Sequence, residues 1–174
     1  MEGLVAQPTR RKIVDVVTEH PGSSAREVQR RASLGWGETA YHLDQLTRAG
    51  ALRRERGGRR DYYFPSTMTW EDRRLFQVLR SGTERRLLLE LSARPGRTLA
   101  ELKEAAGLSL STTSFHLRHL LAQGAVEGFR DGHLRRYRPT RPERVAALVT
   151  RYRESFEDRL VDRFVEAWSG LLGA

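Results

Sequence analysis

The sequence predicts a mainly α-helical fold with small β-hairpins, in which one unit of three helices and a hairpin occurs twice. The first observation is an internal repeat, because an offset of 74 residues aligns residues 9–66 with residues 83–140 without a gap, and about 17 of the 58 pairs are identical. The second is the shared order of caps, glycine stops and turns in the two copies. The third is a long periodic apolar segment after the repeats. We therefore expect a first module at 1–66, a connecting helix at 67–82, a second module at 83–140 and a C-terminal helix at 141–174.

The first two helices of each module have clear ends. In the second copy, "TERRLLLELSARPG" predicts a helix that stops at Pro95-Gly96, and "TLAELKEAAG" predicts a short helix that ends at Gly107. Thr98 and Glu101 form the capping-box pattern that opens the short helix, and Ser24 and Glu27 repeat it in the first copy.

A third helix and a hairpin complete each module. In the second copy, Ser109 or Ser111 can cap a helix that runs to Gly124. The segments "AVEGF" and "LRRYRP" then predict two strands around an Asp-Gly turn, and "ALRRE" and "RDYYFP" match them in the first copy. Three helices followed by a hairpin are the arrangement of a winged helix-turn-helix module.

The C-terminal segment predicts one long helix over residues 143–172, roughly 45 Å in length. The six basic and six acidic residues of 141–174 cancel, so we expect a protein contact there and not a DNA contact. An apolar face of this size predicts a homodimer. The alternative is a monomer in which the two repeats already act as a pseudo-dimer. The predicted dimerisation residues recur at steps of four: Tyr152, Phe156, Leu160, Phe164 and Trp168.

Composition limits the class of function. The formal net charge is +9 and the pI is near 10.8, which favours a polyanionic partner such as double-stranded DNA. The chain has no cysteine and no apolar run long enough for a membrane, so we expect a cytoplasmic, nucleoid-associated protein without membrane contact. We find no glycine-rich phosphate loop, Gly-x-Ser-x-Gly or paired His-Glu motif, and therefore predict no enzyme activity, metal or cofactor. The sequence does not identify a small-molecule effector.

The third helices carry the predicted base-reading residues. A helical wheel separates a leucine face from a polar face that has an aromatic residue at its centre. A thymine methyl or a sugar edge can cover that aromatic residue, and the alternative is packing against the neighbouring module. The predicted DNA-binding residues of these helices are Ser111, Thr112, Phe115, His116, Arg118 and His119 in the second copy, and Tyr41, His42, Gln45 and Arg48 in the first.

His42 and His116 lie at the margin of this face, where we expect a phosphate contact or a structural buttress. His116 and His119 are three residues apart, but we find no carboxylate or thiolate at a helpful spacing and therefore do not predict a metal site.

The hairpins carry the densest positive charge and are predicted to follow phosphates or to enter the minor groove. The alternative is a charged, solvated edge strand. The predicted contacts are Arg54, Arg56, Arg59 and Arg60 in the first hairpin, and Arg130, His133, Arg135 and Arg136 in the second.

The stretch "STTSFHLRHLLAQGAVEGFRDGHLRRYRP" resembles the recognition helix and wing of the ArsR-like winged helix regulators, and the tandem arrangement is similar to regulators common in archaea. The resemblance implies a sequence-selective, DNA-binding transcription regulator with the recognition helix in the major groove. Two features depart from it. The metal-sensing cysteine motif is absent, and the first copy places Glu38 and Asp44 on its readout face, so we expect the second module to dominate. The alternatives are a protein-interaction scaffold and a nucleoid-type architectural protein with little sequence preference.

Overall fold

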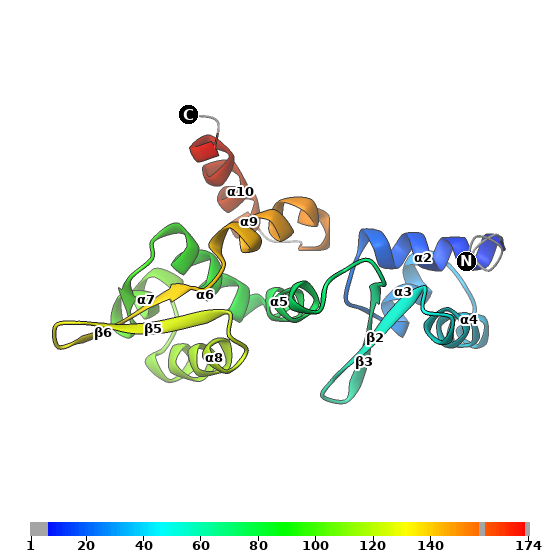
Figure 1. Ribbon diagram of the computed structural model, residues 1–174, viewed down its shortest axis with the longest axis horizontal. Coiled ribbons are helices and arrows are strands. Elements are labelled where there is room, and N and C mark those ends of the chain that lie inside the picture. Colours follow the sequence, from blue (N-terminus) through cyan, green and yellow to red (C-terminus); the bar gives the residue numbers. More distant parts are fainter. Residues whose placement is uncertain (1–6, 157–158, 173–174) are drawn as a thin grey trace. The chain divides into compact units, whose positions relative to one another are not determined.

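The computed structural model describes residues 7–156 and 159–172 of the chain, which divides into two compact units, Met1–Arg73 and Arg74–Ala174 (Figure 1). The fold class is confirmed, because each unit combines helices with a small antiparallel sheet. The first unit contains α2 (Pro8–Glu19), β1 (Ser23–Ser24), α3 (Ala25–Ala32), α4 (Trp36–Arg48), β2 (Leu52–Gly57) and β3 (Arg60–Pro65). The second contains α6 (Gly82–Ala93), β4 (Arg97–Thr98), α7 (Leu99–Ala106), α8 (Leu110–Ala122), β5 (Val126–Asp131) and β6 (Leu134–Pro139).

Local chemistry sets the ends of these helices. Ser24 caps α3 and Thr98 caps α7, and in both capping boxes the glutamate three residues later bonds back to the cap backbone, as predicted. Apolar side chains on the inner faces of the three helices and the sheet then form the core of the first unit. Its buried members are Ile13, Val17, Val28, Leu43, Leu46, Leu52 and Tyr63.

Each sheet has three strands, whereas the sequence predicted two. The two-residue strands β1 and β4 pair with β3 and β6, so the strand orders are β1-β3-β2 and β4-β6-β5. Strands this short leave no alternating pattern in the sequence, and only the folded chain shows them. Both hairpins close through a two-residue turn whose first residue is a glycine at positive φ, Gly58 or Gly132.

The connecting helix is present as α5 (Trp70–Arg80). The Thr69 side chain accepts a hydrogen bond from the backbone N–H of Asp72 at 3.2 Å, so Thr69 caps this helix. Phe76 and Leu79 on this helix are fully buried in the second unit.

The predicted single helix over residues 143–172 is wrong. The chain forms α9 (Pro142–Arg151), leaves the α-helix at Tyr152, continues through a 3₁₀ turn at Arg153–Ser155 and forms α10 (Arg159–Leu172). At the break, the rings of Tyr152 and Phe156 each lie 5.2 Å from the Phe76 ring.

The predicted dimerisation face is consequently mostly internal. Tyr152, Phe156 and Phe164 are buried within the second unit, and α10 packs on α6 and α9. Leu160 and Trp168 are half-buried. The sequence therefore overestimated the apolar surface that a second copy would have to cover.

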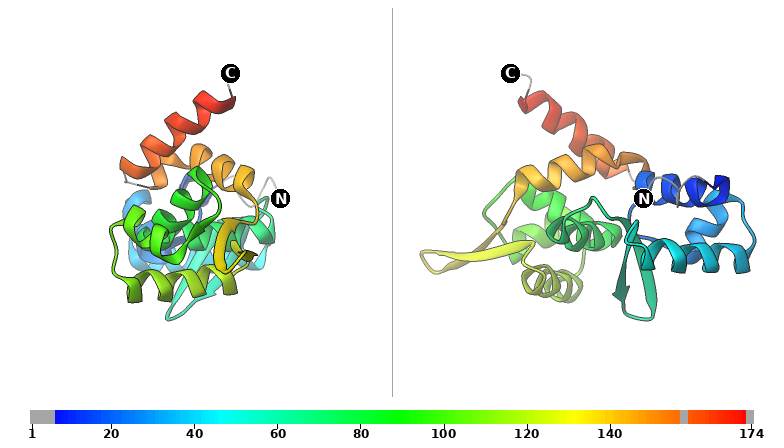
Figure 2. Two further views of the ribbon diagram at one scale, coloured as in Figure 1. Left: turned by 90° about the vertical axis from the view of Figure 1, so that its left-hand side faces the viewer. Right: turned by 45° about the vertical axis from the view of Figure 1, so that its right-hand side comes forward.

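The C-terminal helices leave the third helix of the second unit uncovered. In Figure 2, α9 and α10 lie on the side of α6 opposite to α8. Among the described residues, no helix has the length and apolar character needed to cross a membrane.

Candidate nucleic-acid interface

Hydrogen bonds among serine and threonine side chains fix the start of α8. The Ser109 hydroxyl accepts from the backbone N–H of Thr112 at 3.1 Å and lies 2.8 Å from the Thr112 hydroxyl and 3.0 Å from the Ser111 hydroxyl. Thr113 is buried and bonds the Ser109 carbonyl. Of this cluster, only Ser111 and Ser109 are exposed. The predicted contact residue Thr112 is half-buried and is bonded to the cap residue Ser109.

The outer face of α8 presents an aromatic ring flanked by polar groups. Phe115 is 61% exposed, and both Arg118 and His119 are also exposed. Tyr41 occupies the equivalent position on α4 and is 57% exposed. The helical wheel therefore predicted the outward direction of both rings.

The sequence reading missed one exposed apolar residue at the beginning of each third helix. Trp36 and Leu110 occupy equivalent repeat positions, and both are about half exposed. The helical wheel began one residue later, at Gly37 and Ser111, so these side chains fell outside it. The guanidinium of Arg26 on α3 stacks over the Trp36 ring, 3.9 Å from its centroid, and forms a cation-π pair at the start of α4.

A buried carboxylate links α8 to α6. Oε1 of Glu84 lies 2.7 Å from Nδ1 of His119 and 3.2 Å from Nδ1 of His116, and the Glu84 side chain is only 8% exposed. The expectation that no carboxylate lies near these histidines is therefore wrong. Glu84 precedes His116 by 32 residues, and only the packing of α6 on α8 brings them together.

This cluster acts as a buttress. The two histidines take their orientation from a side chain of the supporting helix, which fixes the position of α8 along α6. The described residues contain no group of three histidine, aspartate or glutamate side chains arranged to hold a metal ion.

The first module supports its helix differently. The residue equivalent to Glu84 is Arg10, whose Nε lies 3.4 Å from Nδ1 of His42. The predicted contact Arg48 forms an ion pair with Asp44 at 2.9 Å, and the Thr9 hydroxyl donates to Glu38 at 3.1 Å. Both acids on this face thus have a partner within the module, which reduces the repulsion that we expected between them and DNA phosphates.

Of the predicted wing contacts, Arg136 is engaged inside the second module. Its guanidinium donates to the Asp131 carboxylate at 2.7 Å and to the carbonyl of Gly96 at 2.8 Å, and it lies 3.6 Å from Glu101. Hydrogen bonds from Thr98, with nearby Arg136, hold the pKa of the Glu101 carboxyl below its usual value. Arg136 therefore braces the hairpin against the rest of the module.

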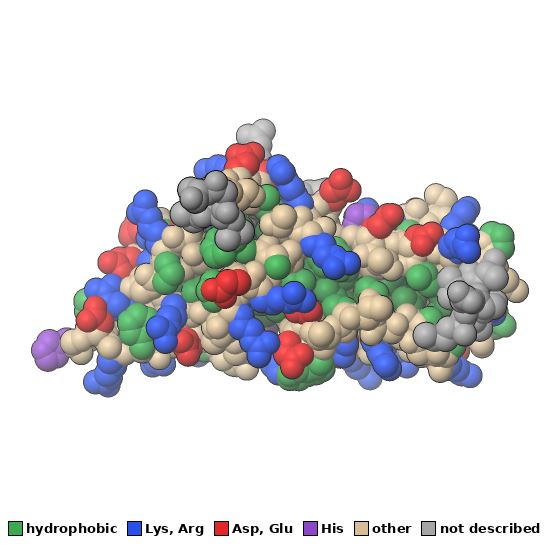
Figure 3. All heavy atoms as spheres, turned by 45° about the horizontal axis from the view of Figure 1, so that its top comes forward, with side chains coloured by type: hydrophobic (Ala, Val, Ile, Leu, Met, Phe, Trp, Pro, Cys, Tyr) green, Lys and Arg blue, Asp and Glu red, His purple; other side chains and the backbone are tan. Residues whose placement is uncertain are grey.

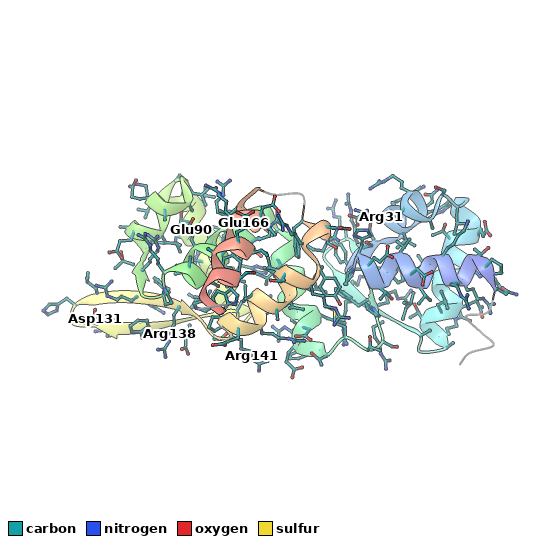
Figure 4. All side chains as sticks on the ribbon, turned by 90° about the horizontal axis from the view of Figure 1, so that it is seen from above. Arg31, Glu90, Asp131, Arg138, Arg141 and Glu166 are labelled. Atoms are coloured by element: carbon teal, nitrogen blue, oxygen red, sulfur yellow. The ribbon has the colours of Figure 1, made fainter. Side chains whose placement is uncertain are left out.

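Arg130, His133 and Arg135 are exposed on the same hairpin. Figure 3 shows basic side chains and a histidine around its end, and Figure 4 labels Asp131 there and Arg138 farther along the strand. Arg138 is paired with Glu127 at 2.6 Å. Arg130 and Arg135 are cross-strand partners, which places two like charges on the same face of the hairpin, and the Arg135 guanidinium lies 5.7 Å from the Tyr137 ring centroid. Such a pair is unfavourable in isolation and becomes favourable when a polyanion lies against it.

The wing of the first module has no equivalent like-charge pair. Its predicted contact Arg56 is the cross-strand partner of Asp61, and Asp61 also lies 3.9 Å from Arg54. The predicted contacts Arg59 and Arg60 are exposed at the turn. The two wings thus have the same backbone and different charge.

Comparisons with known proteins agree with this architecture. A family described as "N-terminal HTH domain" matches residues 7–75, and a family described as "Helix-turn-helix domain" matches residues 73–128. The chain thus contains two helix-turn-helix domains in tandem. An uncharacterised HTH-type transcriptional regulator of Methanocaldococcus jannaschii is 24% identical to it over 132 residues, which are 76% of this chain and 33% of that relative. The chain thus spans about a third of the length of that relative.

Solved structures similar to this winged helix-turn-helix protein match about half of it. A homodimeric winged helix-turn-helix DNA-binding domain from Mycobacterium bovis, titled a possible ArsR-family regulator, is 28% identical, with 46% of this chain and 75% of that chain covered and a TM-score of 0.41. An ArsR family transcriptional regulator is 23% identical over 48% of this chain and 88% of that chain, with a TM-score of 0.36. At these TM-scores, the two similarities carry no functional argument.

Proposed function

We propose that this protein is a sequence-selective regulator that binds double-stranded DNA, with α8 in the major groove and the β5–β6 hairpin on phosphates. The observation that carries the proposal is the cross-strand pair of Arg130 and Arg135, which lies on the wing that follows α8. A polyanion relieves the repulsion between these two charges, and the formal net charge of +9 favours the same class of partner. The proposed activity is binding without catalysis.

The second module supplies most of the affinity in this proposal. Its helix α8 exposes Arg118 and contains no acidic residue. Helix α4 contains Glu38 and Asp44, which are paired with Thr9 and Arg48 but still add negative charge to its outer face. The like-charge pair occurs on the second wing and is replaced by Arg56 opposite Asp61 on the first. The charge of the third helix and the charge of the wing therefore both favour the second module as the main DNA-binding module.

The test is binding of the full chain to mixed-sequence duplex DNA over a range of salt concentrations, followed by selection of preferred sites from a random pool. We expect affinity that falls with salt and a recoverable preferred site. Binding to all sequences alike would support an architectural protein instead, and no binding at low salt would support a protein-interaction scaffold.

Paired variants test which module dominates. Replacing Phe115 and Arg118 with alanine should weaken binding to the selected site by roughly tenfold or more, because each removes a proposed base contact. Replacing Tyr41 and Gln45 is the matched control and should have a smaller effect. If the Tyr41 and Gln45 variant binds more weakly than the Phe115 and Arg118 variant, the order of the modules is reversed.

The proposal also includes a homodimer, with a smaller apolar interface than the sequence predicted. Tyr152, Phe156 and Phe164 are buried in the monomer, which leaves Leu160 and Trp168 of the predicted face half-buried. Trp168 stacks on Phe164 with 5.6 Å between ring centroids. A symmetric contact between two α10 helices through Trp168 would bury this ring and duplicate the DNA-binding modules.

A further inference from the structure

Each third helix exposes one aromatic ring at the centre of its outer face. Tyr41 and Phe115 occupy equivalent repeat positions, and more than half of each side chain is exposed. Apolar rings on the outer face of a helix gain no burial free energy in the free protein. The recurrence of this arrangement in both modules points to a bound state in which the ring is covered.

The two rings are also held in a defined orientation. The Phe115 ring meets the His116 ring edge-on with 5.1 Å between centroids, and Tyr41 meets His42 at the same distance. Each histidine is in turn held by the first helix of its module, His116 by Glu84 at 3.2 Å and His42 by Arg10. Different supporting residues thus maintain the same edge contact, which orders an exposed ring before any ligand arrives.

The neighbours of Phe115 indicate what covers it. Ser111 lies one turn before it and Arg118 one turn after it on the same outer stripe of α8, and both are exposed. Serine can bond base edges, and arginine bonds guanine or phosphate. An apolar ring between these two polar groups requires an apolar group on the base edges, and the only one that the major groove presents is the 5-methyl group of thymine.

We propose that Phe115 is a specificity-determining residue that packs against the 5-methyl group of a thymine in the major groove. The inference rests on the proposed function, since α8 must enter that groove. If this contact forms, part of the sequence preference of the second module is a preference for an A·T pair opposite the centre of α8.

Replacement of thymine by deoxyuridine tests this assignment, because it removes the methyl group and preserves base pairing. Binding of the full chain is measured to short alternating duplexes of deoxyadenosine with thymidine and of deoxyadenosine with deoxyuridine. The wild-type protein should prefer the thymidine duplex by about fourfold, the effect of burying one methyl-sized group. Phe115→Ala should bind both duplexes equally. Leu134→Ala is the matched control, because Leu134 is an exposed apolar residue on the wing and its removal should preserve the preference.

The possible results distinguish failure of the thymine-methyl contact from failure of the proposed DNA binding. Equal binding of the wild-type protein to both duplexes would overturn the methyl contact while leaving DNA binding intact. A preference that persists in Phe115→Ala would assign it to another residue or to DNA shape and would also overturn the inference. Absence of binding to either duplex at low salt would overturn the proposed function together with the inference. Thermal melting of Phe115→Ala should match that of the wild-type protein, since the side chain is largely exposed.

Discussion

Two neighbouring arginines on β6 should respond to substitution in opposite ways. Arg135 is exposed and faces Arg130 across the hairpin, whereas Arg136 is bonded to Asp131 and to the Gly96 carbonyl. If the hairpin lies on phosphates, Arg135→Ala removes one counterion-releasing contact. The slope of log Kobs against log salt should then flatten by about 0.9. The melting temperature without DNA should be unchanged, because the Arg135 side chain is exposed.

Arg136→Ala should instead lower stability. Two hydrogen bonds of a partly exposed guanidinium contribute about 1–2 kcal/mol in total. A loss of that size lowers the melting temperature of a chain of this length by roughly 2–8 °C. The salt slope should stay near that of the wild-type protein, because Arg136 is already committed to partners within the module.

Both quantities are measured on the same preparations, by fluorescence anisotropy on a mixed-sequence duplex at several salt concentrations and by thermal melting without DNA. The reasoning fails if Arg136→Ala flattens the salt slope as much as Arg135→Ala and melts like the wild-type protein. It fails equally if neither variant changes the slope, which would leave the hairpin as a solvated edge.

Three further predictions concern the supports of the interface. Phe76→Ala should destabilise the second unit by about 3–5 kcal/mol, seen as a lower denaturant midpoint, because this ring holds both Tyr152 and Phe156; a loss below 1 kcal/mol would contradict that role. Glu84→Gln should weaken binding to a selected site roughly two- to tenfold with an unchanged salt slope, because it disturbs the orientation of α8 without removing a DNA contact; wild-type affinity would show that the carboxylate is dispensable. In light scattering at micromolar concentration, the full chain should be a dimer and Trp168→Ala a monomer; a dimeric variant would move the interface, and a monomeric wild-type chain would exclude it.

The repeat explains why so much of the fold could be predicted. Each capping box, glycine stop and hairpin turn is a local signal, and agreement between two copies separates such signals from chance. Ser24 with Glu27 and Thr98 with Glu101 form the expected bonds for this reason. The outward direction of Phe115 follows in the same way from the helical period alone.

Errors occurred where the structure depends on contacts between distant residues. Glu84 resembles an ordinary acid in the first turn of a helix, and its bonds to His116 and His119 arise only when α6 packs on α8. The break near Tyr152 has no glycine or proline in the sequence to predict it, and it lies where Tyr152 packs on the buried Phe76 ring. Apolar spacing reports which side chains can share a helix face, but it contains no information on where a packed neighbour ends the helix.

The two modules use one backbone for unequal tasks. Their hairpins have matching registers, yet Arg130 opposite Arg135 in the second corresponds to Arg56 opposite Asp61 in the first. One charge reversal at this position replaces an opposite-charge strand pair with a like-charge pair. In the proposed mechanism, the second module binds first. The covalent connection then raises the local concentration of the first module near the same duplex. Under that condition a weakly binding first module still adds to the affinity of the proposed complex.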